Sequence, residues 1–403
     1  MNKKILFVFN ILLILHIFSF SQVRVKFTDT RFVAYIKHRG DYSLLSGKFN
    51  IIYNYLIDFG YKINGYGEVV YLSNSLTSKE FSRSEARIPV YFPGVYPPCS
   101  DDIVKFKRVR SELVAYIIYK GSYKHILRAY GILNNYIDKH NLTVVGNYSE
   151  VYLNIPRNTP ENELLTEVRV PVNRKGKVDV GIYIDSGAYY KNLQASQEFF
   201  EWAKISYKTM GAKDVINGKI FKNIKVIYFP GGWAGYYSRD IGKKGAENII
   251  DFIKNGGNYL GICAGAYFGA KNIVWKGVKY KGILKFYDSA IGPLDDISHW
   301  PMAGIAKIKF KNGIVKNMYY LGGPYFKVKG KFNPIAYYSK NRLAAFDFNY
   351  GKGKVVLLGF HPEMIAESSK DETKFPLRSG EAVKKSGWIF LKTVFKEILG
   401  GSK

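Results

Sequence analysis

The residues best suited to chemistry in this sequence lie around Cys263. The pentapeptide GICAG (residues 261–265) places one thiol between two glycines, directly after an apolar run. A nucleophile on a tight strand-to-helix turn has strained backbone angles, and the residues two positions away must be small to avoid clashes. A helix that follows such a turn favours the thiolate, and the Ala264 amide could donate to an oxyanion. The alternative is an inert, buried core cysteine.

A partner for this thiol is found near the C-terminus. A strand-like run leads into the tripeptide HPE at residues 361–363. In an extended segment residues i and i+2 point the same way, so His361 and Glu363 share a face. A catalytic thiol needs a base within reach and a carboxylate that orients this base. The sequence therefore predicts Cys263 as nucleophile, His361 as base and Glu363 as the orienting acid.

The second half of the chain supplies elements that could position these residues. Apolar, strand-like runs alternate with segments of helical spacing. The expected strands are 178–184, 224–229, 259–262, 343–348 and 355–359, and the expected helices lie near 193–205 and 243–254. This alternation predicts a mostly parallel sheet with helices on both faces and an active site at the carboxyl ends of its strands.

Three motifs of this half resemble the class I glutamine amidotransferase-like superfamily: a PGG loop at 230–232, the GICAG elbow and a strand ending in HPE. The segments GICAGAY, LGGPYF and GFHPE are most similar to its biotin-protein ligase N-terminal-like subfamily. The resemblance covers residues 178–402 and implies an α/β flavodoxin-like fold. It gives Cys263, His361 and Glu363 the three roles stated above.

The same resemblance implies further site residues. Gly232 and Ala264 would supply oxyanion amides, and the substrate cleft would include Gly231, Tyr267, Gly322 and Gly323. Glutaminases of this superfamily usually carry Gln or Glu four residues after the nucleophile, where this chain has Tyr267. Glutamine hydrolysis is therefore not expected. No biotin-ligase core signature is recognised in the sequence, so ligase activity is not implied either. His299 is a weaker candidate for the cleft.

The first half of the chain contains an internal duplication. The segments 34–42 and 115–123 are alike, and apolar positions of helical spacing recur 81 residues apart, as in Leu45 and Ile126 or Leu56 and Ile137. Each unit (31–90 and 112–172) reads strand, helix, strand, strand. The prediction is an α+β domain in which two helices pack against one antiparallel sheet.

The segment EVYLNIPRNTPENELLTEVRVPV (150–172) resembles the closing signature of GyrI-like, or AraC-type effector-binding, domains. The resemblance implies a small-molecule cleft between the two units, often lined by aromatic residues and a carboxylate. By position the candidates for effector binding are Glu150, Glu167, Tyr35, Tyr116 and Tyr152. Sheet packing is the simpler explanation of each tyrosine.

The N-terminus predicts export. Residues 1–4 carry two lysines, residues 5–20 are almost wholly apolar, and small residues precede Gln22, as in a secretory signal peptide. In many relatives a DNA-binding helix-turn-helix stands in this place, so a regulator of transcription is not expected. The organisation is a signal peptide (1–21), an effector-binding domain (22–172), a linker (173–177) and an α/β domain (178–403), in a periplasmic or secreted protein. Membrane contact would occur only through an uncleaved signal segment.

The amino-acid composition limits the classes of partner and cofactor that we expect for this protein. Apolar residues make up 47% of the chain, and 60 Lys and Arg against 32 Asp and Glu give a formal charge of +28. The lysines are spread along the chain without a binding stripe, so no nucleic-acid partner is expected. The only cysteines are Cys99 and Cys263, and a disulfide between them is not expected. No metal or other cofactor is expected, because no Cys/His/Asp cluster has metal-ligand spacing. The oligomeric state stays open, although proteins with this α/β fold often form homodimers.

Two functions remain open from the sequence. The first is an exported thiol-dependent hydrolase or amidase acting on a small amide or ester, with an N-terminal domain that binds a small molecule. The second is a non-catalytic extracytoplasmic binding or sensing protein.

Overall fold

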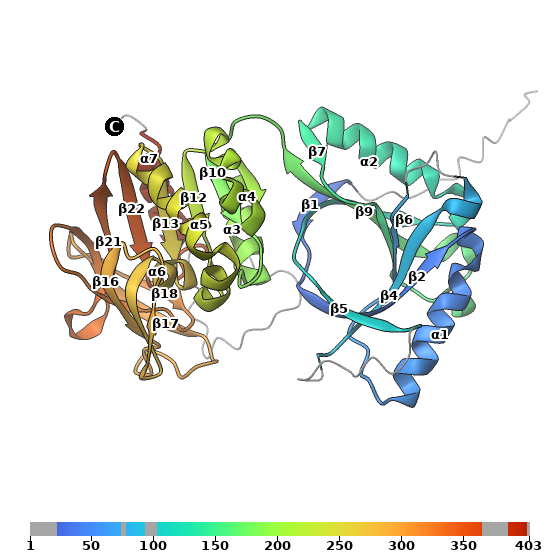
Figure 1. Cartoon of the computed structure of the whole chain (residues 1–403), viewed down its shortest axis with the longest axis horizontal. Coiled ribbons are helices and arrows are strands. Elements are labelled where there is room, and N and C mark those ends of the chain that lie inside the picture. Colours follow the sequence, from blue (N-terminus) through green and yellow to red (C-terminus); the bar gives the residue numbers. More distant parts are fainter. Residues whose placement is uncertain (1–21, 74–77, 93–102, 365–385, 401–403) are drawn as a thin grey trace, which may run out of the picture.

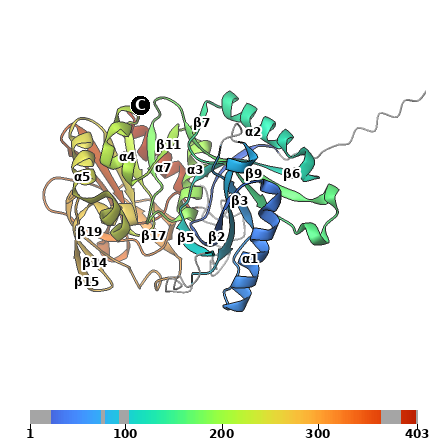
Figure 2. The same ribbon diagram turned by 45° about the vertical axis from the view of Figure 1, so that its right-hand side comes forward.

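The computed structural model describes residues 22–73, 78–92, 103–364 and 386–400. The predicted signal peptide and Cys99 lie outside these residues. Two bodies lie side by side (Figure 1), and the turned view of Figure 2 shows the strands of the N-terminal body behind its two long helices. Among the described residues, no helix is both long and apolar enough to cross a bilayer.

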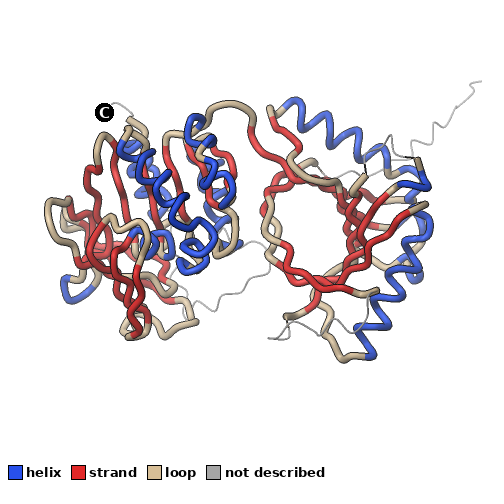
Figure 3. Tube along the Cα trace, viewed as in Figure 1, coloured by secondary structure: helices blue, strands red, loops and turns tan. Residues whose placement is uncertain are grey.

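The N-terminal body is a curved antiparallel sheet in the order β1-β6-β9-β8-β3-β4-β2-β5, with β7 paired to β9. Figure 3 shows its two helices outside the ring of strands. The elements are β1 (Arg24–Phe27), β2 (Arg31–Arg39), α1 (Leu45–Asp58), β3 (Glu68–Tyr71), β4 (Arg83–Val90), β5 (Lys105–Val109), β6 (Leu113–Lys120), α2 (Leu127–Lys139), β7 (Leu142–Val144), β8 (Ser149–Tyr152) and β9 (Leu165–Arg174).

The two predicted units correspond to β2-α1-β3-β4 and β6-α2-β8-β9. The helices bury the predicted apolar stripes, with Ile52 and Leu56 on α1 and Leu133 and Ile137 on α2 all buried. Each unit is preceded by a strand that the sequence did not predict. Each of these strands pairs with the other unit: β1 pairs with β6, and β5 pairs with β2.

The linker prediction needs a correction at its first two residues. Asn173 and Arg174 continue β9, because they pair with Thr143 and Leu142 of β7. Asn173 also contacts the C-terminal body. Its amide donates to Thr209 O at 2.9 Å, and its Oδ1 accepts from Thr209 N at 3.0 Å.

The C-terminal body is built on a parallel sheet in the order β11-β10-β12-β13-β22. Its helices and strands are β10 (Val180–Tyr183), α3 (Tyr190–Ala203), β11 (Tyr207–Met210), α4 (Ala212–Asn217), β12 (Val226–Phe229), α5 (Ala234–Lys254), β13 (Asn258–Ile262), α6 (Ala264–Gly269), β22 (Gly353–Leu358) and α7 (Ser386–Ile398). The helix expected from residue 243 begins earlier, at Ala234, and α5 has a break at Gly242.

Both faces of this parallel sheet are covered, because consecutive strand residues point to opposite sides. Tyr228 of β12 contacts Phe200 of α3 and Phe395 of α7. The next residue, Phe229, contacts Tyr237 of α5 on the other side. This is the layered α/β architecture that the alternating pattern predicted.

Beyond β22 the sheet is extended by strands of mostly antiparallel pairing, in the order β21-β19-β16-β14-β15, with β20 on β21 and β17 and β18 beside it. They are β14 (Ala270–Trp275), β15 (Val278–Lys281), β16 (Tyr287–Gly292), β17 (Gly304–Phe310), β18 (Val315–Tyr320), β19 (Tyr325–Lys327), β20 (Asn333–Tyr337) and β21 (Leu343–Tyr350). The sequence predicted only the last of these. The segment separates β13 from β22 in the chain, although the two strands are neighbours in the sheet.

Candidate active site

Cys263 lies on a strained turn between β13 and α6. Its φ of 50° and ψ of −102° fall outside the regions that L-residues prefer. A Cβ on Gly261 would lie 2.5 Å from the carbonyl oxygen of Gly265, and a Cβ on Gly265 would lie 2.2 Å from the oxygen of Phe229. Both positions therefore require glycine, as the elbow prediction stated.

The thiol faces a cavity rather than apolar packing. Cys263 is 6% exposed and lines a cavity of about 660 Å³ together with His361. Its Sγ donates a hydrogen bond of 3.5 Å to the carbonyl oxygen of Leu321. The sulfur is free of any disulfide in the described part of the chain.

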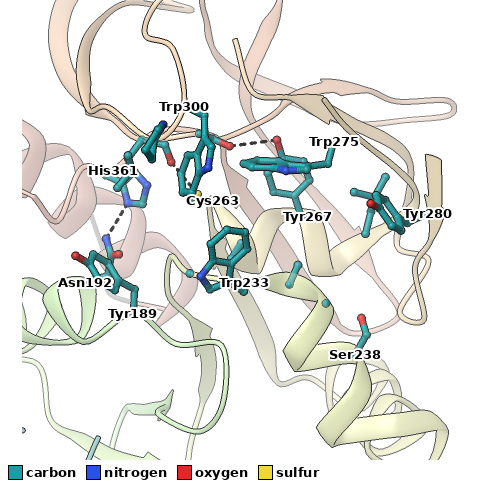
Figure 4. A pocket seen from close by; sticks show the side chains of 18 of the residues that line it. Tyr189, Asn192, Trp233, Ser238, Cys263, Tyr267, Trp275, Tyr280, Trp300 and His361 are labelled. Atoms are coloured by element: carbon teal, nitrogen blue, oxygen red, sulfur yellow. Dashed lines mark hydrogen bonds between the residues drawn. The ribbon is translucent and has the colours of Figure 1, made fainter. Parts of the chain in front are cut away.

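Sheet pairing brings His361 to this sulfur. Ile262 pairs with Leu358, so the residues just beyond both strands emerge at the same edge. Figure 4 shows the imidazole beside Cys263. The described residues give His361 Nε2 no hydrogen bond within ordinary limits. Cys263 and His361 line the same cavity, and Cys263 is one of the groups that raise the pKa of the imidazole.

The other imidazole nitrogen is held by Glu363. His361 Nδ1 lies 2.8 Å from Glu363 Oε1, and both side chains are buried. Burial lowers the pKa of His361, but the nearby charges of Glu363 and Cys263 outweigh it and raise the pKa to about 10. At neutral pH the ring is therefore an imidazolium paired with the carboxylate.

Asn192 of α3 completes this arrangement, although no sequence pattern predicted its role. Its Nδ2 lies 3.0 Å from Glu363 Oε1 and 3.0 Å from His361 Nδ1. Glu363 Oε1 thus accepts from both the imidazole and the amide, which fixes the ring in one orientation. The only signal was its place on a buried helix face, which does not reveal a partner 169 residues away.

Gly232 and Ala264, the residues predicted to supply oxyanion amides, both line the cavity that Cys263 lines. Ala264 is the first residue of α6, and the first N–H of a helix has no acceptor within the helix. Gly232 has a φ of 146°, and the hydrogen bonds around it are made by its neighbours, from Tyr189 N to Gly231 O and from Trp233 N to Gly187 O.

The predicted cleft residues divide into two groups. Tyr267 and Gly322 line the cavity, and the Tyr267 hydroxyl donates to Gly322 O at 3.2 Å. Gly231 and Gly323 are not among the lining residues. A Cβ on Gly231 would lie 2.6 Å from His361 Cε1, and one on Gly323 would lie 1.7 Å from Gly359 O, so both serve close packing beneath the site.

Aromatic residues that the sequence did not predict form much of the cavity wall. Trp233, Trp275 and Trp300 come from three separate segments and contact one another edge to face (Figure 4). His299 is exposed, 3.7 Å from Asp295, and its neighbour Trp300 takes the place in the cavity wall instead.

The five effector-binding candidates do not form one site. Val151 pairs with Glu167 in the β8–β9 ladder, so Glu150 and Tyr152 point to one face of the sheet and Glu167 points to the other. Glu150 is buried under α2, where it accepts hydrogen bonds from Tyr130 at 2.7 Å and Tyr152 at 3.2 Å. Burial raises the pKa of Glu150, although these tyrosines oppose the shift.

The opposite face of this sheet carries charged clusters. Lys107 contacts Glu85 and lies 4.3 Å from the ring centre of Tyr35. Lys26 likewise contacts Glu167 at 2.7 Å and lies 4.2 Å from the ring centre of Tyr116. Tyr35, Tyr116 and Glu167 are therefore grouped by face, and each already has a charged or aromatic partner.

Glu68 lies among arginines on this same face. It contacts Arg169 at 2.5 Å and Arg31 at 2.8 Å, with Arg87 at 3.7 Å. Burial raises the pKa of Glu68, but the three arginines lower it more, to about 2. In the described ranges, no group of three or more His, Cys, Asp or Glu side chains could hold a metal ion.

Comparison with known proteins agrees with this two-part organisation. Residues 21–173 match the GyrI-like small molecule binding domain, and residues 179–289 match the N-terminal part of biotin-protein ligase. The chain therefore carries a GyrI-like domain followed by a domain of the biotin-protein ligase N-terminal family.

Individual relatives are distant. A biotin–protein ligase of Schizosaccharomyces pombe is 28% identical over 165 residues, which is 36% of this chain. The chain spans about a quarter (26%) of that ligase's length. An uncharacterized protein of Chlamydia muridarum is 26% identical over 245 residues, covering 54% of this chain and 94% of the relative.

Solved structures are also similar at low identity. A glutamine amidotransferase structure has 16% identity and a TM-score of 0.39, and covers 55% of this chain and 98% of its own. The EcmrR C-terminal domain has 17% identity and a TM-score of 0.35, and covers 38% of this chain and 98% of its own.

Proposed function

We propose that the C-terminal domain is a thiol-dependent hydrolase or amidase for a small amide or ester. The observation that carries the proposal is a strained cysteine facing a cavity beside an imidazole that a buried carboxylate holds. This combination of nucleophile, base and orienting group is what nucleophilic catalysis requires.

The proposed reaction proceeds in two stages. The Cys263 thiolate attacks the carbonyl carbon, and the amides of Gly232 and Ala264 stabilise the resulting oxyanion. The imidazolium of His361 gives its proton to the departing amine or alcohol, leaving a thioester. Water then attacks the thioester while His361 accepts its proton. The carboxylic acid is released, the sulfur leaves as the thiolate, and the starting pair of thiolate and imidazolium is restored.

Glutamine is a poor fit for this site. The position four residues after Cys263 carries Tyr267, whose ring contacts Trp275 and whose hydroxyl is bonded to Gly322. We therefore propose a substrate other than free glutamine. The match to part of a biotin–protein ligase does not carry that enzyme's activity to this chain.

The proposal is tested by turnover. Wild-type protein, Cys263→Ala and the control Cys99→Ala are incubated with amide and ester libraries, and products and acyl-enzyme masses are measured. We expect Cys263→Ala to lose about 10³-fold or more of the rate, and Cys99→Ala to keep it. A catalytic role of Cys263 is contradicted if turnover persists in Cys263→Ala, or if the wild-type protein turns over no member of the libraries.

The alternative is a non-catalytic binding or sensing protein. It is favoured by the GyrI-like domain, whose match implies binding of a small molecule. Ligand-dependent thermal stabilisation that is equal in wild type and Cys263→Ala, without turnover, would support this alternative.

We further propose that the protein is exported by the segment 1–21. The proposal rests on the sequence pattern of that segment. Cell fractionation and N-terminal sequencing of the mature protein test it. A mature chain that begins near Gln22 outside the cytoplasm supports export, and an intact Met1 in the cytoplasm contradicts it.

A further inference from the structure

The wall of the cavity around Cys263 is dominated by indole rings. The chain has only five tryptophans, and three of them line this cavity. The centroid distances are 5.4 Å between Trp233 and Trp300, 5.3 Å between Trp275 and Trp300, and 6.3 Å between Trp233 and Trp275.

Separate elements deliver these rings to one place. Trp233 follows β12 and precedes α5, Trp275 ends β14, and Trp300 lies in the segment between β16 and β17. Tyr267 of α6 adds a fourth ring, 5.7 Å from Trp275. Figure 4 shows these rings around the space that adjoins Cys263. The interplanar angles between the rings are 66° to 82°, so the cavity walls face in different directions. A planar group could therefore contact both the faces and the edges of the rings.

Trp233 is 49% exposed, although it lies beside the reactive sulfur. An indole left half in water gains free energy when a ligand covers it. The ring is held in place by its contacts with Trp275 and Trp300, so covering it costs little further ordering. This is the arrangement of a binding surface that is formed before the ligand arrives.

The polar groups of the cavity decide what kind of ligand fits these rings. None of the described lining residues is acidic, whereas Lys281 and the protonated His361 are basic. Asn192 already donates its amide to Glu363. The ammonium group of a free amino acid would find no carboxylate partner here. A quaternary ammonium ion could contact the indole faces, but Lys281 and the protonated His361 would repel its charge.

From these observations we infer that the cavity binds an aromatic group without a positive charge next to the scissile carbonyl, so that the substrate is an aryl or arylalkyl amide or ester. This inference rests on the proposed function for the location of the carbonyl, but not for the binding of the ring. Stacking on Trp233 and Trp300 places the ring, and the Gly232 and Ala264 amides receive the carbonyl oxygen. A cavity of about 660 Å³ holds a ligand considerably larger than a glutamine side chain.

Binding is measured on Cys263→Ala, so that turnover is not needed. The ligands are benzamide, 2-naphthamide, glutamine, choline and cyclohexanecarboxamide, which is the saturated counterpart of benzamide. The affinity of each ligand is measured by calorimetry and by tryptophan fluorescence. We expect the aromatic amides to bind about tenfold or more tightly than cyclohexanecarboxamide, with glutamine and choline weaker still.

Variants locate the binding site. In the Cys263→Ala background, Trp233→Ala should weaken 2-naphthamide about tenfold, and Trp300→Phe should weaken it less because one ring remains. Trp202→Phe is the control, since Trp202 contacts Trp388 outside the cavity. Circular dichroism confirms that each variant is folded.

Two results would overturn the inference: equal affinity for the aromatic and saturated amides, or unchanged 2-naphthamide affinity in both Trp233→Ala and Trp300→Phe. Its failure is distinguishable from failure of the proposed function. Aromatic binding without turnover would contradict only the proposed hydrolase function. Thiol-dependent turnover of non-aromatic amides would contradict only the inferred preference for aromatic substrates.

Discussion

The protonation of His361 depends on one carboxylate. Glu363 is wholly buried, and its Oε1 accepts hydrogen bonds from His361 Nδ1 and Asn192 Nδ2. The raised pKa of the imidazole means that the ring keeps its proton below pH 10 and loses it above. The proton needed by the leaving group is thus available across the neutral range.

Replacing Glu363 by Gln should lower the pKa of His361. Burial, which disfavours the imidazolium, is then opposed only by Cys263 and no longer by the Glu363 charge. The alkaline limit of the hydrolysis rate should move down by more than about one pH unit. The measurement is the pH profile of kcat/KM from pH 5 to 11. Glu161→Gln, which changes an exposed carboxylate, serves as the control. An unchanged profile in Glu363→Gln would exclude the assigned orienting role.

Glu68 should contribute to stability in a pH-dependent manner. Its folded-state pKa of about 2 lies below the ordinary value of 4.5, so its stabilisation is present above pH 4.5 and is lost as the pH falls toward 2. Glu68→Gln should lower the free energy of unfolding by about 3–5 kcal/mol at pH 7, because three arginines lose their shared partner. The loss should be smaller at pH 3.5. Urea denaturation at both pH values measures it, and a pH-independent difference would contradict the assignment.

At the scale of elements, the elbow depends on close contact between β13 and α6. The carbonyl oxygens of Gly265 and Phe229 occupy the space that side chains at 261 and 265 would need. The strained backbone of Cys263 is therefore maintained by its neighbours rather than by its own preference.

Gly261→Ala should disrupt this turn. A Cβ at 2.5 Å from Gly265 O forces the backbone apart, so we expect a loss of about 2 kcal/mol or more in unfolding free energy and a loss of activity. The matched control is Gly131→Ala on α2, where no atom lies within 4 Å. That variant should be neutral or up to about 1 kcal/mol more stable. Thermal denaturation compares the two, and similar effects of both changes would argue against the elbow.

Local sequence patterns predicted the elements with strong periodicity. The 3.6-residue apolar stripes located α1 and α2, and the buried runs located β12, β13 and β22. The short strands β1 and β5 were missed because each is paired only through the other unit, which local alternation does not reveal. The strands of the antiparallel extension other than β21 were also missed, although β14 pairs with β15 and β17 with β18, their neighbours in the chain.

The site residues that could be predicted from the sequence are those that stand within short, recognisable motifs. Cys263, His361 and Glu363 stand within GICAG and HPE, whose spacing has a direct physical meaning. Asn192, Trp233, Trp275 and Trp300 carry no such spacing, because tertiary packing alone brings them together. The five proposed effector-binding residues were separated by the strand register, which is fixed only once β8 and β9 pair.

At the scale of the whole molecule, the two domains are joined by specific contacts as well as by the chain. Asn173 forms two hydrogen bonds with Thr209, Gln197 Nε2 donates to Val25 O at 2.8 Å, and Arg110 pairs with Asp185. A further cavity, lined by Arg110, Asp185 and Tyr189 among others, lies between the domains and shares Trp233 with the cavity around Cys263.

Asn173→Ala should loosen this junction. Loss of two partly buried hydrogen bonds should cost about 1–3 kcal/mol and increase proteolytic cleavage near residues 175–177. The control is Asn255→Ala, whose side chain bonds only within the end of α5. Limited proteolysis and small-angle scattering test the prediction, and identical behaviour of the two variants would contradict it.

The pH dependence of Cys263 alkylation examines the reactive centre without requiring a known substrate. Iodoacetamide labelling of each cysteine is followed by mass spectrometry from pH 5 to 9, in wild type and in His361→Asn, with Cys99 as the internal reference. We predict that Cys263 reacts faster than Cys99 in this pH range, and that His361→Asn removes this advantage. Labelling of Cys263 that is slower than Cys99 at every pH, or unaffected by His361→Asn, would contradict an activated thiol.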